Sequence, residues 1–224
     1  MANQPAQTLG RAPARTAEVN ALIRNTYTLL AMTLLFSAAT AGISMALQLP
    51  HPGLLITLAG YFGGLFLVHK LRNSAWGIAA VFALTGFMGF TLGPMLNAYI
   101  AAFSNGSQLV MLALGGTGAI FVGLSGYALT SKRDFSFMGG FLMAGILVAF
   151  LAGLAAIFFS IPALSLGVSV MFVLLMCGLI LYQTSEIVNG GETNYILATL
   201  TLYVALYNLF TSLLHLLGAF GGDD

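Results

Sequence analysis

The stretch EIVNGGETNY, residues 186–195, is a polar break between two long apolar runs near the end of the chain. It contains two of the six acidic residues of the protein and an adjacent pair of glycines. Glycine favours a helix end, whereas carboxylates and side-chain cap oxygens favour a helix start. The stretch therefore predicts the place where one long helix stops and the next begins.

The composition of the whole chain indicates a membrane protein. Of the 224 residues, 59% are hydrophobic and 6% are charged, and the mean hydropathy is +0.97. An ordinary soluble domain has roughly a quarter charged residues, so this chain cannot cover itself with polar surface. The net charge of +1 provides no positive field for nucleic acid, which excludes that class of partner.

Seven apolar runs predict an all-α polytopic membrane protein with seven transmembrane helices. Each run is long enough to cross ~30 Å of hydrocarbon as a helix, with every backbone hydrogen bond closed internally. The Pro50-His51-Pro52 connection predicts an antiparallel hairpin of the first two spans, and Ile161-Pro162 predicts one of the fifth and sixth. The predicted spans are residues 26–47, 53–69, 75–97, 108–130, 136–159, 163–183 and 194–217.

The basic residues predict the orientation of the chain. All of them fall before the first span or after the second and fourth spans, which places them on one side of the membrane. By the positive-inside rule that side is the cytoplasm, so the N-terminus is expected inside and the C-terminus in the periplasm. The basic residues are Arg11, Arg15, Arg24, Lys70, Arg72, Lys132 and Arg133.

The N-terminal segment has the composition of a disordered tail. Residues 1–20 are rich in Ala, Gln, Asn, Thr and Pro, and Pro5 and Pro13 oppose a regular helix. We expect a disordered cytoplasmic tail over residues 1–24 and one seven-helix domain over residues 25–220. The tail from Met1 to Asn20 is either an inert leader or a handle for a processing machine.

The sequence contains no motif for catalysis or metal binding. Cys177 is the only cysteine, the three histidines lack metal-ligand spacing, and no Gly-x-Ser-x-Gly or His-Glu-x-x-His motif is present. No acidic residue falls in the middle of a predicted span, which excludes a buried carboxylate pair. We therefore expect no enzyme activity, cofactor or metal. His215 could either line a water path or form an internal or interfacial hydrogen bond.

Small residues recur at the spacing of helix packing. The pairs are Gly60 with Gly64, Gly89 with Gly93, and Ala119 with Gly123. Such pairs let transmembrane helices approach closely, which strengthens dispersion contacts in a solvent that offers no hydrophobic drive. We expect all three pairs to pack the bundle.

The residues around the opening stretch allow two interpretations. Gln183 and Glu186 can share a face at the cytoplasmic end of the sixth span, where they would form the polar mouth of a pore. Alternatively, residues 190–194 act as the stop and start of two helices and nothing more.

Several strings in order resemble the Bax inhibitor family of seven-span membrane proteins, and most closely its bacterial YccA-like branch. They are RNTY at 24–27, TGFMGFTLGP at 85–94, KRDFSFMGG at 132–140, LYNLF at 206–210 and, most specific, GGETNYI at 190–196. The signature of the seventh span thus includes Gly190, Gly191, Glu192, Thr193, Asn194 and Tyr195.

The resemblance implies a fold in which six outer spans enclose the seventh. It also implies a pH-sensitive calcium leak through an aspartate pair, whose positions fall here on Gln183 and Ala205. Neither residue is a carboxylate, whereas calcium prefers carboxylate oxygens and a proton-sensitive gate needs two interacting acids. Glu186 could substitute in part, and Gln183, Glu186 and Asn208 are the candidate polar residues of a pore.

The bacterial branch implies a different function in the inner membrane. Its members resemble partners and substrates of the membrane-anchored AAA protease FtsH, associated with HflK and HflC. In that role the tail from Met1 to Asn20 would be the handle that the protease grips. The leading hypothesis is a non-enzymatic, multi-pass modulator of FtsH, and the alternative is the cation or calcium leak channel.

Overall fold

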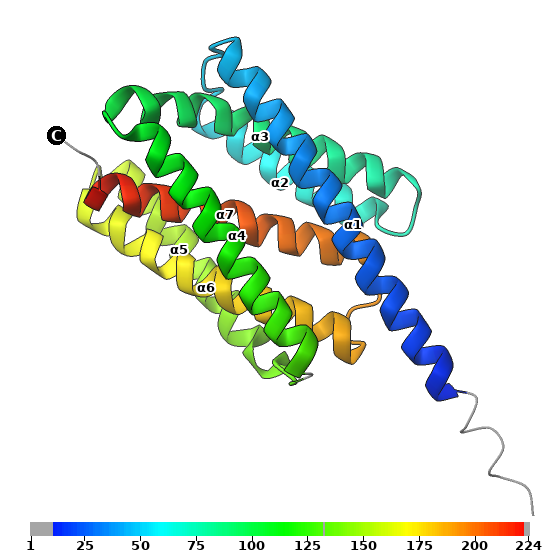
Figure 1. Cartoon of the computed structure of the whole chain (residues 1–224). Helices are drawn as coiled ribbons and strands as arrows, with labels where there is room; N and C mark the ends of the chain where they lie inside the picture. The colour runs from blue at the N-terminus through cyan, green and yellow to red at the C-terminus, as the bar shows by residue number, and fades with distance from the viewer. Residues whose placement is uncertain (1–10, 132, 222–224) are drawn as a thin grey trace, which may run out of the picture.

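The computed structural model describes residues 11–131 and 133–221 as a bundle of long helices (Figure 1). Seven of them are long and apolar enough to cross a membrane, which confirms the prediction of an all-helical chain with seven long apolar helices. A short 3-10 turn, η1 (Ser136–Met138), precedes the fifth. The helices are α1 (Arg11–Ala46), α2 (Leu54–Leu71), α3 (Trp76–Ala102), α4 (Gly106–Ser131), α5 (Gly139–Phe158), α6 (Pro162–Asn189) and α7 (Tyr195–Gly221).

Helix α7 lies in the centre of the bundle. In its most apolar window 61% of the residues are buried, against 6% in α2 and 17% in the span formed by η1 and α5. Within the described residues, α7 packs against α1, α2, α3, α4 and α6, whereas α5 packs on α6 and η1 alone. The seventh span is therefore central as expected, but five helices contact it instead of six.

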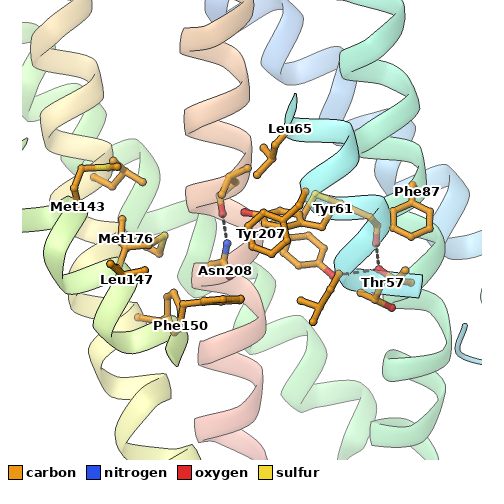
Figure 2. Close-up of a pocket in the computed structure, with 18 residues that line it drawn as sticks. Thr57, Tyr61, Leu65, Phe87, Met143, Leu147, Phe150, Met176, Tyr207 and Asn208 are labelled. Atoms are coloured by element: carbon orange, nitrogen blue, oxygen red, sulfur yellow. Dashed lines mark hydrogen bonds between the residues drawn. The ribbon is translucent and has the colours of Figure 1, made fainter. Parts of the chain in front are cut away.

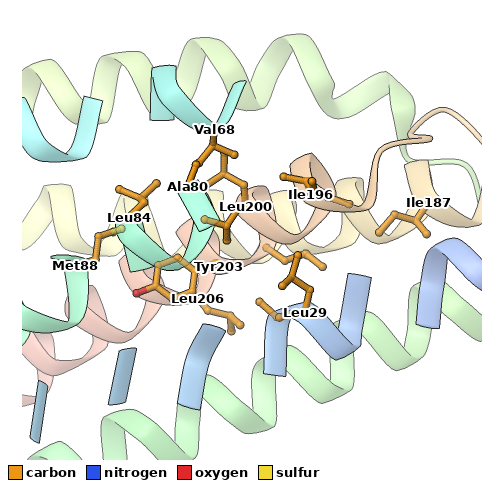
Figure 3. Packing of buried hydrophobic residues seen from close by; sticks show 14 residues of the cluster. Leu29, Val68, Ala80, Leu84, Met88, Ile187, Ile196, Leu200, Tyr203 and Leu206 are labelled. Carbon is orange, nitrogen blue, oxygen red and sulfur yellow. The ribbon is translucent and has the colours of Figure 1, made fainter. Parts of the chain in front are cut away.

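The largest apolar cluster surrounds Tyr203 of α7 (Figure 3). Leu29 from α1, Val68 from α2 and Leu84 from α3 reach it, and all three are at most 3% exposed. Helices with apolar side chains all round gain little from burial in a lipid solvent, so close packing of this kind must supply the attraction between them.

Several polar side chains of α7 are paired with neighbouring helices. The Tyr203 hydroxyl lies 2.7 Å from Ser37 Oγ of α1 and donates to the Thr85 carbonyl of α3 at 3.3 Å. Further along the helix, His215 Nδ1 lies 2.8 Å from Ser169 Oγ of α6. An unpaired polar group in hydrocarbon is costly, and these bonds remove that cost. For His215 the internal hydrogen bond is confirmed.

The contact between α1 and α3 depends on two glycines and a proline. A Cβ added to Gly89 would meet the Ser37 carbonyl, and one added to Gly93 would meet the Ser44 side chain, so both positions require glycine. Pro94 lies inside α3 and has no N–H to donate to the Phe90 carbonyl. Ser44 Oγ of α1 donates to that carbonyl at 3.0 Å. A neighbouring helix thereby supplies the hydrogen bond to the Phe90 carbonyl that Pro94 cannot make.

The other two predicted small-residue pairs have different outcomes. Gly60 lies against the Phe87 ring and Gly64 against Leu84, so this pair packs α2 on α3 as expected. A Cβ at Gly123 would meet nothing within 4 Å. The expectation for Ala119 with Gly123 is therefore wrong, because that face of α4 has no helix against it at Gly123.

One of the two predicted hairpins is also wrong. Helices α5 and α6 pack on each other, as the Ile161-Pro162 joint predicts, and Pro162 occupies the first turn of α6. Among the described residues, however, α1 and α2 share no packing contact, because each packs on α3. The glycines at these contacts let α1 and α2 each approach α3 closely.

The N-terminal end of α1 differs from the sequence-based expectation. The helix begins at Arg11, so residues 11–24 are helical where a disordered tail is expected. Pro13 falls in the first turn, where a backbone N–H has no partner in the helix in any case. At 36 residues α1 is about 54 Å long, and its N-terminal end extends past the bundle (Figure 1). Residues 1–10 of the expected tail lie outside the described residues.

The α1–α3 contact leads to a test by double substitution. We expect Ser44→Ala to lower the free energy of unfolding by about 1 kcal/mol, because it leaves the Phe90 carbonyl without a donor. In a Pro94→Ala background the backbone N–H restored at position 94 binds that carbonyl, so the same serine substitution should cost much less. Thermal unfolding in detergent measures both effects. Equal losses in the two backgrounds would contradict the proposed role of Ser44.

Candidate functional site

The connection between α6 and α7 is a pair of helix caps. Gly190 ends α6 with φ +80°, a left-handed conformation that favours glycine. The N–H groups of Gly191 and Glu192 donate to the Glu186 carbonyl at 2.8 and 3.1 Å. These bonds satisfy the last turn of α6, and they confirm that the Gly pair stops the helix.

The start of α7 is capped by two side chains from the same stretch. Glu192 Oε1 accepts the N–H groups of Thr193 and Asn194 at 2.8 and 2.7 Å. Asn194 Oδ1 accepts the N–H groups of Ile196 and Leu197 at 3.0 and 3.2 Å. The capping interpretation of this stretch is therefore confirmed by geometry.

Side chains at the end of α6 and in the α6–α7 connection also bind two other connections. Asn194 Nδ2 donates to the Arg72 carbonyl at 2.9 Å, in the connection between α2 and α3. Ser185 Oγ of α6 donates to the Arg133 carbonyl at 3.0 Å and accepts the Phe135 N–H at 2.9 Å, in the connection between α4 and α5. Three connections far apart in the sequence are thus tied together at one end of the bundle.

This end carries three carboxylates but has no geometry for a metal. The carboxylates belong to Asp134, Glu186 and Glu192, and the Ser136 N–H donates to Asp134 Oδ1 at 2.8 Å. That hydrogen bond lowers the pKa of Asp134, so its carboxylate is ionised at neutral pH. Among the described residues, no three His, Cys, Asp or Glu side chains are placed to hold a metal ion.

The two positions expected for the family aspartate pair are both buried. Ala205 is fully buried in an apolar cluster with Met176 and Ile180. Gln183 is 5% exposed, and within the described part of the chain its Nε2 has no hydrogen-bond partner. The next residue, Thr184, lies 3.3 Å from the Tyr27 hydroxyl. These positions offer calcium no carboxylate ligand.

The structure separates Asn208 from the other candidate pore residues. Asn208 lies midway along α7 at a cavity of about 570 Å³, which neither Gln183 nor Glu186 lines. Figure 2 shows Asn208 and Tyr207 between Tyr61 on one side and Leu147 and Phe150 on the other. The three candidates therefore do not form one polar mouth.

This cavity is the feature that sequence reasoning missed. Its lining comes from α2, α3, α5, α6 and α7, and most of its side chains are apolar. In the sequence, only the adjacent Tyr207 and Asn208 indicate a polar position on the seventh span.

Comparison with known proteins identifies the family of the chain. The family model described as inhibitor of apoptosis-promoting Bax1 matches residues 19–222.

The chain belongs to the Bax inhibitor family.

Bacterial relatives match almost the whole chain. A protein of Escherichia coli (strain K12) named modulator of FtsH protease YccA is 51% identical over 197 residues, 88% of this chain and 89% of that protein. An uncharacterized protein of Pseudomonas aeruginosa is 50% identical over 216 residues, 96% of this chain and 97% of its own length. The protein is thus a YccA-like member of the Bax inhibitor family.

The same relative in Escherichia coli O6:H1 is named inner membrane protein YccA, with equal identity and coverage. Together with the seven candidate spans, this similarity makes the chain an inner-membrane protein. The relative from Escherichia coli (strain K12) is named a modulator of a protease, not an enzyme. This agrees with the expectation that the chain is a non-enzymatic membrane protein.

The hydrogen bonds of Asn194 at the α6–α7 connection lead to a prediction with a matched control. Asn194→Ala removes both the cap of α7 and the bond to Arg72, and we expect it to cost about 1–2 kcal/mol. Asn194→Asp keeps the cap oxygen but cannot donate to the Arg72 carbonyl, so it should cost less. Hydrogen exchange at Ile196 and Leu197 should quicken in the alanine variant and stay near wild type in the aspartate variant. Equal exchange in both variants would contradict the capping role.

Proposed function

We propose that this protein is an inner-membrane partner that modulates an FtsH protease and is also its substrate. The observation that carries the proposal is the 51% identity, over 88% of the chain, to the modulator of FtsH protease YccA. Association with HflK and HflC is part of the same proposal. The absence of a carboxylate at Gln183 and Ala205 supports this function over the calcium leak.

The proposal requires that the N-terminus lies in the cytoplasm and the C-terminus in the periplasm. The charge distribution supports this orientation, because the connections that meet at the α6–α7 end carry Arg72 and Arg133. The N-terminal end of α1 extends beyond the bundle (Figure 1), within reach of a cytoplasmic machine. Residues 1–20 would then be the handle that the protease grips.

The packing of the bundle explains how a substrate can also modulate its protease. Extraction must pull on α1, which is fastened to α3 by Gly89, Gly93 and Ser44 and to α7 by Ser37. Breaking these contacts is slow when several must open together. A protease that has bound this chain remains occupied during that time, so it degrades other substrates more slowly.

Deletion of the N-terminal segment tests the handle. Removing residues 2–20 should lengthen the half-life of the protein in cells with active FtsH several-fold, because the gripping site is lost. Replacing residues 2–10 by a Gly/Ser segment of equal length is the control, and it should leave turnover near wild type since the length of the segment is kept. Pulse-chase with and without FtsH measures both. Unchanged turnover after the deletion would contradict the handle.

Calcium flux separates the proposal from the leak-channel alternative. We expect the wild-type protein to leave calcium entry into proteoliposomes at the level of protein-free vesicles, because Gln183 and Ala205 provide no carboxylate. The variant Gln183→Asp with Ala205→Asp restores both acids and should raise entry. Calcium entry through the wild type that exceeds the protein-free level would favour the leak channel and contradict this part of the proposal.

A further inference from the structure

The cavity between α2 and α5 has the size and lining of a binding site. Its volume of about 570 Å³ falls within the range of roughly 300–1,000 Å³ that ligand sites occupy. The lining includes Leu65, Phe87, Leu147, Phe150 and Met176, and none of the described residues contributes a charged side chain to it. Its surroundings thus favour hydrocarbon.

The cavity reaches the outer surface of the bundle between α2 and α5. Within the described residues these two helices share no backbone packing, and the Phe62 and Phe150 rings, 5.5 Å apart and edge to face, bridge them. Phe62, Met143 and Leu147 line the cavity and are also 47%, 70% and 59% exposed. Residues that belong to both the cavity and the exposed surface mark its mouth, and this mouth faces the side of the bundle that lipid covers.

Several polar side chains of the cavity already have partners within the protein. Asn208 Nδ2 donates to the Val204 carbonyl at 2.8 Å, and Thr57 Oγ1 donates to the Gly53 carbonyl at 2.8 Å. The Tyr207 hydroxyl lies 3.3 Å from Thr91 Oγ1. Because these groups need no further partner, the part of a ligand that enters the cavity can be purely apolar.

The position of the cavity excludes a polar headgroup and a partner helix. Asn208 is midway along α7, so the site lies near the middle depth of the bundle, where a charged group is costly. Two turns of a helix 10 Å across occupy about 850 Å³, which exceeds the cavity. A flexible chain of methylenes can enter sideways and fill it, and an empty apolar space would forfeit those dispersion contacts.

We propose that this cavity binds one acyl chain of a membrane phospholipid, inserted from the bilayer between α2 and α5. The headgroup stays at the membrane surface, and the chain lies against Phe62, Leu147 and Phe150. The inference is independent of FtsH, because the site lies away from the tail and from the α6–α7 connection.

Photocrosslinking in vesicles of phosphatidylethanolamine and phosphatidylglycerol tests the proposal. The probe is phosphatidylethanolamine with a diazirine near the end of one acyl chain, and the full-length protein is used without a protease. In the wild type, labelled peptides should concentrate on cavity residues such as Phe150, Met176 and Tyr207. Labelling spread evenly over exposed residues such as Met111 on α4 would overturn the proposal without any variant.

A matched pair of neighbouring residues on α5 gives the control. Leu147→Trp places a large side chain at the mouth and should reduce labelling of Met176 and Tyr207 at least about tenfold. Val148→Trp adds the same side chain at an exposed position, 56% accessible, that does not line the cavity, and labelling should stay near wild type. Equal labelling in both variants, each with a wild-type melting temperature, would also overturn the proposal.

Discussion

The bond between the Tyr203 hydroxyl and Ser37 Oγ, 2.7 Å long, represents the constraint on which the bundle depends. Helix α7 is surrounded by protein yet carries tyrosines, threonines, an asparagine and a histidine. Lipid cannot satisfy such groups, so each must bond within α7, as Asn208 and Thr211 do, or to donors and acceptors of other helices at defined positions. The central position of α7 therefore depends on which helices surround it, because some of their groups bond its polar side chains.

The same constraint explains the glycines, the proline and the caps. Gly89 and Gly93 bring α1 close enough for Ser44 to reach the Phe90 carbonyl that Pro94 leaves free. At the end of the bundle, Asn194 caps α7 and binds the Arg72 carbonyl at the same time. Each feature removes an unsatisfied backbone group, and each also positions one helix relative to another. A chain extracted by a protease would have to break several of these ties together.

Much of this arrangement can be predicted from the sequence, and the reasons for the failures are physical. The seven helices follow from apolar runs of spanning length, and Gly190 and residues 192–194 predict the caps because their chemistry is local. The partners of α1 and α2 could not be predicted, because helices that are apolar on every side show no preferred face. For the same reason, the sequence alone did not separate Asn208 from Gln183 or indicate a cavity beside Tyr61. The helical start at Arg11 differs from the prediction because Pro13 opposes a helix interior but is compatible with the first turn, where it falls.

The most direct test of the central constraint is a double-mutant cycle between Ser37→Ala and Tyr203→Phe, with the free energy of unfolding measured in detergent or bicelles. The two side chains meet across α1 and α7, so the single effects should not add. We expect a coupling energy of about 0.5–2 kcal/mol. Additive effects, with coupling near zero, would contradict the claim that hydrogen bonds to α7 hold the bundle together.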